Sequence, residues 1–504
     1  MTAEVEMTGI VKRFGDLVAN IQVDFSVEKG EIRALVGENG AGKTTLMKVL
    51  FGLYRPEEGT IKIRGETVEL HNPGEAIAHR IGMVHQHFML FEDLTVTENI
   101  IYGMEPKKWG FVDRGAARKQ VVDLAEQYGF KLKPDVCLGT LSVGERQRVE
   151  IVKTLFRGAD VLILDEPTAV LTPQERDELF DMLRSLSQQG KTIILITHKL
   201  REVMALSHRA TVLRRGRVMG NVKTSETSIE ELACMMVGRE VFLKVNKPPK
   251  DPGEPILCVE NLTLLGDGGR HILDTISFEV HAGEIVGLAG VAGNGQTELV
   301  DVLVGFEQAS DGKITLNGEN VTKFSIAKRR EKGMSYIPED RYRRGLAVTA
   351  SVAENLVMGF HRDEPISRRG LINANQLGSF ANRLIGEFDV RISSPDEMAG
   401  NLSGGNLQKV VLAREFSHPS RFILADQPTR GVDIGATEFI HQKIIDRRVA
   451  GDAILLISAD LNEIMSVSDR ILVIYAGKIV ASIPAEEAEE QELGLLMAGS
   501  KQEA

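Results

Sequence analysis

The sequence is poor in cysteine. Three cysteines occur in 504 residues, Cys137, Cys234 and Cys258, and they stand far apart. None forms the CxxC pairs that hold zinc, and three separated thiols do not build a disulfide framework. The pattern argues against a disulfide-rich or zinc-dependent fold and is typical of a reducing cytosol.

Long apolar runs are also missing. No stretch approaches the ~18 uncharged apolar residues that a membrane-spanning helix requires. The first six residues, MTAEVE, carry two acidic groups where a signal peptide carries positive charge and then an apolar run. If the protein works at a membrane, we expect it to do so from the cytoplasmic face, as a peripheral protein that contacts the bilayer only through partner subunits.

The chain has no excess of positive charge. Lys and Arg number 60 against 71 Asp and Glu, which gives a formal net charge of −11. This balance argues against a protein that coats nucleic acid, and we expect no nucleic-acid partner. The mean hydropathy of −0.07 is ordinary for a folded protein. At 504 residues the chain is too long for one core, so two or more domains are expected.

The sequence is a duplication. Residues 37–44 (GENGAGKT) recur as residues 290–297 (GVAGNGQT), 253 positions later. Residues 141–144 (LSVG) recur as residues 402–405 (LSGG), 261 positions later, so the second copy contains eight extra residues between these motifs. Chance similarity does not keep its register in this way, and we conclude that two related halves were joined.

The two halves are predicted to be α/β domains. Short continuous apolar runs, such as residues 161–164 and 192–196, alternate with helical patterns. Such runs suit strands of a largely parallel sheet that is buried on both faces. Residues 86–141 lack strand signals and look helical, so each half is expected to combine a mixed or parallel-sheet phosphate-loop core with a helical subdomain.

The join between the halves is rich in lysine, proline and glycine from residue 245 to residue 255. Proline and charge oppose both helix and sheet, so this segment is interpreted as a short extended linker. We predict a first domain at residues 4–240, a linker at 241–255 and a second domain at 256–500.

Residues 37–44 match the phosphate-loop pattern GxxxxGK[ST]. They follow an apolar run and open an amphipathic helix, which is the context that the pattern requires. Glycines allow backbone N–H groups to wrap phosphate oxygens, and the helix N-terminus adds its dipole. Lys43 is expected to bridge the β- and γ-phosphates of ATP, and the Thr44 hydroxyl to ligate Mg²⁺. The predicted ATP-binding residues here are Gly37, Glu38, Asn39, Gly40, Ala41, Gly42, Lys43, Thr44 and Thr45.

Residues 161–166 (VLILDE) form an apolar run that ends in two carboxylates. Asp165 is expected to complete the Mg²⁺ shell, and Glu166 to polarise the attacking water. An Asp-Glu pair at the end of a strand is often only the start of a solvated loop. Here His198 stands at the end of the next apolar run, which favours a catalytic role for Glu166 and makes His198 a candidate γ-phosphate sensor.

The LSVGERQ motif at 141–147 and the LSGGN motif at 402–406, together with Gln86 and His198, resemble the signature and switch motifs of ATP-binding-cassette proteins. The resemblance covers nearly the whole chain in two copies. It implies that the two cassettes pair head to tail, so that the phosphate loop of one half and the signature of the other hold each ATP. The first ATP would then also contact Leu402, Ser403, Gly404, Gly405 and Asn406.

The resemblance also assigns roles to two further residues. Gln86 would contact both the γ-phosphate and Mg²⁺. Phe14, which lies 29 residues before Lys43, would stack on adenine. The alternative for Phe14 is an ordinary phenylalanine of the buried core.

The second half lacks the residues that the chemistry needs. Gln296 replaces the phosphate-loop lysine, and Gln427 replaces the catalytic glutamate. An amide cannot take a proton from water, and loss of a general base alone costs roughly 10²–10⁴-fold in rate. Asp267 stands where the first half has its stacking aromatic. The predicted degenerate site consists of Gly290, Gly293, Gly295, Gln296, Thr297, Glu339, Asp426, Gln427 and Ala459, with Ser142 and Gly144 from the first half.

Two classes of tandem cassettes lack membrane segments: ATPases of importers, and soluble ATPases that act on ribosomes or DNA. The short proline-bearing linker and the single degenerate site favour an importer. The chain resembles the fused ATPase subunits of ribose-type monosaccharide and nucleoside (basic membrane protein) systems. Residues 83–90, 141–150 and 290–296 lean toward the nucleoside branch. Simple sugars and riboflavin stay open as cargo, since nothing in an ATPase subunit contacts the solute.

This resemblance implies a set of partners and a location. One copy of the chain would bind two transmembrane permease subunits and, through them, a substrate-binding lipoprotein. The complex would lie at the cytoplasmic face of the bacterial plasma membrane.

Overall fold

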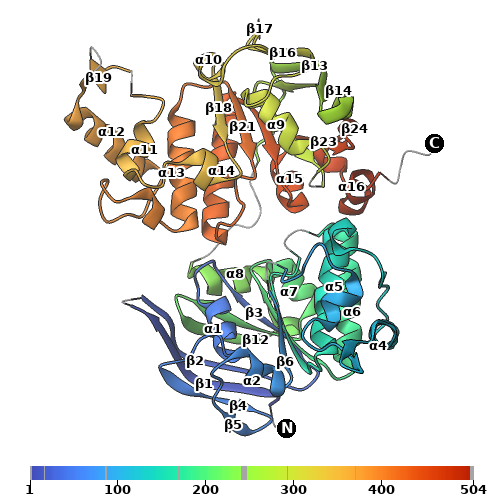
Figure 1. Ribbon diagram of the computed structural model, residues 1–504. Coiled ribbons are helices and arrows are strands. Elements are labelled where there is room, and N and C mark those ends of the chain that lie inside the picture. The colour runs from blue at the N-terminus through green and yellow to red at the C-terminus, as the bar shows by residue number, and fades with distance from the viewer. Residues whose placement is uncertain are drawn as a thin grey trace. The chain divides into compact units, whose positions relative to one another are not determined.

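The computed structural model describes residues 3–15, 17–85, 88–168, 171–239, 247–291, 293–361, 363–368 and 371–499. The chain divides into two compact units, Met1–Val241 and Phe242–Ala504. In Figure 1 the first unit runs from blue to green and the second from yellow-green to red. Residues 241–246 of the predicted linker lie outside the described residues.

The first unit contains two main sheets. An antiparallel sheet has the order β2-β1-β4-β5, and a six-stranded sheet has the order β12-β11-β3-β10-β9-β6. The strands are β1 (Val5–Phe14), β2 (Leu17–Val27), β3 (Ile32–Gly37), β4 (Glu58–Ile63), β5 (Glu66–Val68), β6 (Ile81–Val84), β9 (Val161–Asp165), β10 (Thr192–Thr197), β11 (Arg209–Arg214) and β12 (Arg217–Lys223). Strands β6, β9, β10, β3 and β11 pair in parallel, and β12 adds an antiparallel edge. Every residue of β3, β9 and β10 is buried, which confirms the fully buried parallel strands predicted from the apolar runs.

Helices cover this sheet and form a separate helical segment. The helices are α1 (Lys43–Leu50), α2 (Pro73–Ala78), α3 (Val96–Ile101), α4 (Arg114–Gln127), α5 (Val143–Phe156), α6 (Pro173–Gln188), α7 (Leu200–Leu206) and α8 (Ile229–Val237). The helical segment α3–α5 also carries a hairpin of β7 (Lys107–Lys108) and β8 (Phe111–Val112). The expectation that residues 86–141 hold no strand is therefore wrong, because two-residue strands are too short to leave an alternating pattern.

The second unit repeats this architecture. Its sheets have the orders β14-β13-β16-β17 and β18-β21-β22-β15-β23-β24, and β19 pairs with β20. The strands are β13 (Pro255–Leu265), β14 (His271–His281), β15 (Ile285–Ala289), β16 (Asp311–Leu316), β17 (Glu319–Asn320), β18 (Met334–Ile337), β19 (Ser367–Arg368), β20 (Leu371–Ile372), β21 (Phe422–Asp426), β22 (Ala453–Ile457), β23 (Arg470–Tyr475) and β24 (Lys478–Pro484). The helices are α9 (Gln296–Val304), α10 (Ile326–Glu331), α11 (Val352–Val357), α12 (Ala374–Glu387), α13 (Gly404–Ser417), α14 (Ile434–Ala450), α15 (Leu461–Val467) and α16 (Glu490–Met497), with a π-helical turn at Arg341–Gly345. The matching strand orders confirm two related α/β halves.

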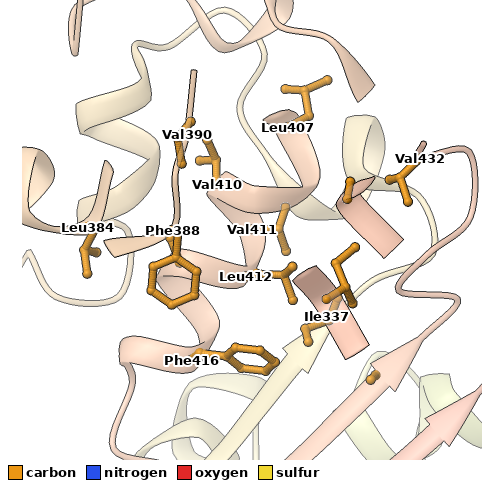
Figure 2. Close-up of a cluster of buried hydrophobic side chains, with 14 of the residues drawn as sticks. Ile337, Leu384, Phe388, Val390, Leu407, Val410, Val411, Leu412, Phe416 and Val432 are labelled. Carbon is orange, nitrogen blue, oxygen red and sulfur yellow. The ribbon is translucent and has the colours of Figure 1, made fainter. Parts of the chain in front are cut away.

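Apolar packing fixes the signature helix of the second unit to its sheet. Figure 2 shows Leu407, Val410, Val411, Leu412 and Phe416 of α13. They lie beside Leu384 of α12, Phe388 directly after α12, and Ile337 of β18. All of these side chains are buried. Burial of such side chains stabilises the fold by about 1.5–3 kcal/mol each before the loss of chain entropy. The packing therefore sets where the N-terminus of α13, and with it Ser403, is held.

In each unit a buried asparagine forms hydrogen bonds with the backbone of the loop that precedes the helical segment. The Asn99 side chain accepts a hydrogen bond from Phe91 N at 2.8 Å and donates to the carbonyls of Phe91, Leu94 and Thr95. In the second unit Asn355 makes the same four bonds to Ala347, Ala350 and Ser351. Asn99 is 1% exposed. One amide thus organises a loop that has no regular hydrogen-bond ladder of its own.

We predict that Asn99→Ala destabilises the first unit. The substitution leaves the Phe91 N–H without its partner and removes one of the two hydrogen bonds that each carbonyl accepts, which together cost about 2 kcal/mol. The melting temperature of the full chain's first unfolding transition should fall by roughly 4–8 °C, measured by scanning calorimetry. Gln120→Ala, on the exposed face of α4, is the matched control and should leave the transition in place. Equal melting temperatures for the two variants would contradict the role given to Asn99.

Candidate functional site

The phosphate loop of the first half lies between β3 and α1. Gly42 is the N-cap of α1 with φ 99°, a left-handed conformation that glycine adopts without strain. The Lys43 ammonium donates hydrogen bonds to Gly37 O at 2.7 Å and Glu38 O at 2.9 Å. Burial lowers the pKa of Lys43, although the carboxylates of Glu166 and Asp165 act in the opposite direction. The loop thus gathers a cation and a helix N-terminus, the combination that binds phosphate.

Two oxygen groups meet at the carboxyl end of β9. The Thr44 hydroxyl donates to Asp165 Oδ1 at 3.4 Å. Burial raises the pKa of Asp165, and the hydrogen bond from Thr44 partly offsets this effect. Magnesium in nucleotide sites takes one or two protein oxygens and completes its octahedron with phosphate and water. Thr44 and Asp165 fit that pattern and are the residues that could hold the ion.

Glu166 follows Asp165 in a strained turn. Its φ is 48°, which is unusual for a residue other than glycine, and its N–H donates to Ile196 O at 2.9 Å. Glu166 Oε1 lies 2.8 Å from Nδ1 of His198. Burial acts to raise the pKa of Glu166, but the hydrogen bond and charge of His198, with the charge of Lys43, hold the pKa below its usual value. At neutral pH the group is therefore a carboxylate that can accept a proton.

The other predicted residues of the first half are distributed around this centre. Asn39 and Gly40 are exposed at the tip of the loop, while Ala41 is buried beneath it. Phe14 is 42% exposed at the end of β1, with its ring edge-on to Tyr54, so the alternative of a buried core phenylalanine is wrong. Gln86 and its predicted contacts lie outside the described residues.

The two signature serines have different neighbours. Ser142 caps α5 by accepting from Glu145 N, and its hydroxyl lies 3.3 Å from Glu175 Oε1. Ser403 stands at the N-cap position of α13 without a capping hydrogen bond from its side chain, and its hydroxyl accepts a hydrogen bond from the Asn406 amide at 3.1 Å. The serine of the first signature therefore has a carboxylate beside it, and the serine of the second has an amide, although the Asp433 carboxylate lies near Gly405 of the second signature.

Glu175 is a residue that the sequence analysis missed. It lies on α6, 33 positions after Ser142, and it also fills the space in front of Gly144. No local motif connects the two positions, so only the packing of α6 against α5 identifies the contact.

In the second half the substituted residues bond to the protein itself. Gln296 Nε2 donates to Leu288 O at 3.3 Å, and Gln427 Oε1 accepts from Ala459 N at 3.0 Å. Glu339 forms an ion pair with Arg430. Burial raises the pKa of Asp426 to about 7, so that much of this carboxyl is protonated at neutral pH. Asp267 stands in the sequence where the first half has its stacking aromatic, and the structure describes only its backbone.

The remaining loop residues of the second half keep the backbone of the first. Gly293 and Gly295 have φ of 89° and 104°, close to the 79° and 99° of Gly40 and Gly42. Thr297 is exposed at the start of α9. The shape of a phosphate loop is therefore retained although its lysine is gone.

Among the described residues, no helix is both long and apolar enough to cross a bilayer. In the same part of the chain, no group of three or more His, Cys, Asp and Glu side chains is gathered as a metal site.

Comparison with known proteins gives consistent matches. The family model described as ABC transporter matches residues 21–169 and 273–430. The chain is 48% identical over 500 residues to a guanosine import ATP-binding protein of Bacillus subtilis, covering 99% of this chain and 98% of that protein. It is 45% identical to a nucleoside import ATP-binding protein of Lactococcus lactis, covering 98% of both chains. A glucose import ATP-binding protein of Haloferax volcanii is 44% identical over 99% of this chain and 96% of its own.

A solved structure resembles nearly the whole chain. It is the complex of an archaeal ribosomal stalk protein with an archaeal ribosome recycling factor. The TM-score is 0.62 at 21% identity, with 94% of this chain and 90% of the other covered. At this identity the likeness shows the fold alone.

We predict that Gly42→Ala impairs nucleotide binding. A Cβ at Gly42 would overlap the backbone carbonyl of Ala19, which cannot move as a side chain can. The affinity for a fluorescent ATP analogue should fall by roughly 5- to 150-fold, since strain and overlap of this kind cost about 1–3 kcal/mol. Gly295→Ala is the matched control: its φ is also positive, but the new Cβ meets the movable side chains of Leu273 and Ile474 and comes no closer than 3.3 Å to a backbone atom, Cα of Gly477. Equal losses in both variants would show that the first loop has no special role.

Proposed function

The chain belongs to the ABC transporter family, and we propose that it hydrolyses ATP at one competent site to drive the import of a nucleoside. The observation that supports a nucleoside as cargo is the identity to two import ATP-binding proteins over nearly the full length of the chains. The identity is 48% to the one named for guanosine and 45% to the one named for nucleosides. Three sequence stretches, at 83–90, 141–150 and 290–296, support the same branch.

A simple sugar is the second candidate cargo. It is favoured by the 44% identity to a glucose import ATP-binding protein. Riboflavin is an alternative from sequence resemblance alone. A ribosome- or DNA-acting ATPase has weaker support, since the relatives with high identity are named for import.

The residues of the first half divide the work of hydrolysis. Lys43 and the backbone N–H groups of the loop hold the phosphates, and Glu166 takes a proton from the attacking water. His198 orients Glu166 through the 2.8 Å contact and lies where it can sense the γ-phosphate. Mg²⁺, held by Thr44, Asp165 and Gln86, would neutralise phosphate charge. The resulting ADP and phosphate leave when the site opens.

We place the second-half signature against this ATP in a head-to-tail pairing. The neighbours of the two serines support the assignment, because Ser403 has the Asn406 amide beside it and Ser142 has the Glu175 carboxylate. The second phosphate loop would face Ser142, so the first-half signature and the degenerate loop form one site. In that site Gln427 stands at the position that Glu166 occupies in the first half.

The partners follow from the importer role. Two permease subunits would span the membrane, a substrate-binding lipoprotein would deliver the solute to them, and this chain would sit peripherally at the cytoplasmic face. Both halves of the nucleotide sandwich are on one chain, so one copy per permease pair suffices. The mass of the purified complex by light scattering tests this number, and two copies would refute it.

The cargo assignment predicts selective uptake. Cells that carry this chain with its two permeases and binding protein should accumulate labelled nucleoside, and unlabelled ribose, glucose or riboflavin in excess should not compete. Glu166→Gln should abolish the accumulation, which separates this route from other transporters in the cell. Uptake that competes with glucose or ribose and not with nucleosides would transfer the assignment to sugars.

If only one site is competent, substitutions at the two sites should lower ATP turnover to different extents. Glu166→Gln should reduce ATP turnover of the assembled transporter by roughly 10²–10⁴-fold, because it removes the general base. Ser403→Arg should be nearly as damaging, while Ser142→Arg, facing the degenerate site, should be milder. Gln427→Glu should add little activity, because Gln296 and Ala459 would still hold the γ-phosphate poorly.

The comparison of the two serine variants decides the one-site assignment. Both changes place an arginine at the N-terminus of a signature helix, so each controls for the other. Equal loss from Ser142→Arg and Ser403→Arg, or substantial turnover in Glu166→Gln, would contradict a single competent site.

A further inference from the structure

Helix α7 carries a buried carboxylate that the hydrolysis chemistry does not use. Glu202 lies in the first turn of α7 and is 5% exposed. A carboxylate at this depth costs free energy unless hydrogen bonds or cations compensate for the lost water. Its partners therefore indicate why it is there.

The first partner of Glu202 follows the catalytic turn. The Thr168 hydroxyl lies 2.6 Å from Glu202 Oε1 and 2.7 Å from Oε2, and Thr168 is 4% exposed. Hydrogen bonds from a hydroxyl to an ionised carboxylate are short and strong. Thr168 is two residues after Glu166, so this bond anchors the chain directly beyond the general base.

The second partner precedes the γ-phosphate sensor. The Thr197 hydroxyl donates to Glu202 Oε2 at 3.4 Å and accepts from Lys199 N at 3.0 Å. The Lys199 ammonium lies 3.5 Å from Glu202 Oε1 and donates to Thr168 O at 3.2 Å. Glu202 is therefore bonded to the residue just before His198 as well as to the one beyond Glu166.

The backbone of Glu166 needs such an anchor. A φ of 48° is disfavoured for glutamate and persists only where the surrounding structure holds it. The residue is held on its N-terminal side by β9 and by its N–H bond to Ile196. On its C-terminal side the buried contact between Thr168 and Glu202 supplies a fixed point.

We propose that Glu202 is a positioning residue that fixes Glu166 and His198 relative to each other, by hydrogen-bonding both of the loops that carry them. The inference rests on the proposed role of Glu166 as general base. Glu202 itself contacts neither nucleotide nor water in this scheme and acts only through Thr168 and Thr197. Its loss should therefore lower the rate of hydrolysis more than the affinity for ATP.

The second half provides a natural control. Glu463 occupies the same place in α15, the third residue of the helix, and is also 5% exposed. It bonds to Nε2 of His441 at 2.9 Å, where the first half has Phe180 in the matching position of α6. The hydroxyl of Ser458, which precedes Ala459, accepts from Asp460 N. The carboxylate was retained, but in the half without a general base it is bonded to a different partner.

The test measures kcat and KM for ATP in the assembled transporter. Glu202→Ala should lower kcat by roughly 10- to 100-fold, the scale of effect for a small displacement of a catalytic group, with KM changed less than about threefold. Glu202→Gln keeps an oxygen that accepts from Thr168 and should recover part of the loss. Glu463→Gln should leave kcat unchanged within about twofold, because it does not contact the competent site.

Thr168→Val provides an independent route to the same bond. Alone it should reproduce part of the fall in kcat, because it removes the bond to Thr168 and leaves the bond to Thr197 in place. In combination with Glu202→Ala it should add little, because Glu202→Ala already removes the bond to Thr168. Melting temperatures identify any variant that fails to fold. If Glu202→Ala does not fold, the kcat values of Thr168→Val and Glu202→Gln test the positioning role instead. A kcat within twofold of wild type for a folded Glu202→Ala, a matching rise in KM, or additive losses with Thr168→Val would overturn the inference.

The variant Glu166→Gln distinguishes failure of the proposed general base from failure of the positioning role. Full turnover in Glu166→Gln would refute the general base itself. Loss of turnover in Glu166→Gln with normal kcat in Glu202→Ala would refute only the positioning role.

Discussion

The first half holds one carboxylate, the proposed general base, in a backbone conformation that its own residue type disfavours. Glu166 stands at the end of a fully buried strand with φ 48°, and its side chain meets His198 at 2.8 Å. Strain of this kind is tolerated at functional sites because the surrounding structure determines the position. Parallel strands β9 and β10 supply the frame, since their carboxyl ends bring residues 32 positions apart into contact.

The same turn is present in the second half, where Gln427 stands in place of Glu166. Gln427 has φ 51° and its side chain accepts from Ala459 N, so an internal bond takes the place of the Glu166–His198 contact. The backbone is set by strands β21 and β22, which pair in parallel as β9 and β10 do. The backbone conformation is thus the same with glutamine as with glutamate at this position. The fold of the second half, including its signature helix α13, was kept because the packing that stabilises it does not involve the lost groups.

Electrostatics strengthens the asymmetry between the halves. In the first half Lys43 lies near two carboxylates and His198 keeps the pKa of Glu166 low. In the second half burial raises the pKa of Asp426 to about 7, and no lysine stands at position 296 to favour its ionised form. A protonated Asp426 is a poor ligand for a hard cation. The two sites therefore differ in charge as well as in the identity of a few residues.

Much of the fold and the family could be predicted from the sequence because the motifs that indicate them are contiguous. The phosphate loop of residues 37–44, the strand ending in Asp165 and Glu166, and the repeat itself are local patterns, and they predicted two α/β halves and the family. The bonds of Glu202 to Thr168, and of Ser142 to Glu175, join residues 34 and 33 positions apart and leave no periodic trace. The hairpin of β7 and β8 was missed because its strands are two residues long. The sequence by itself determines which side chains are present. Tertiary packing decides which of them contact each other, because a hydrogen bond depends on distances that only the folded sheet and its helices set.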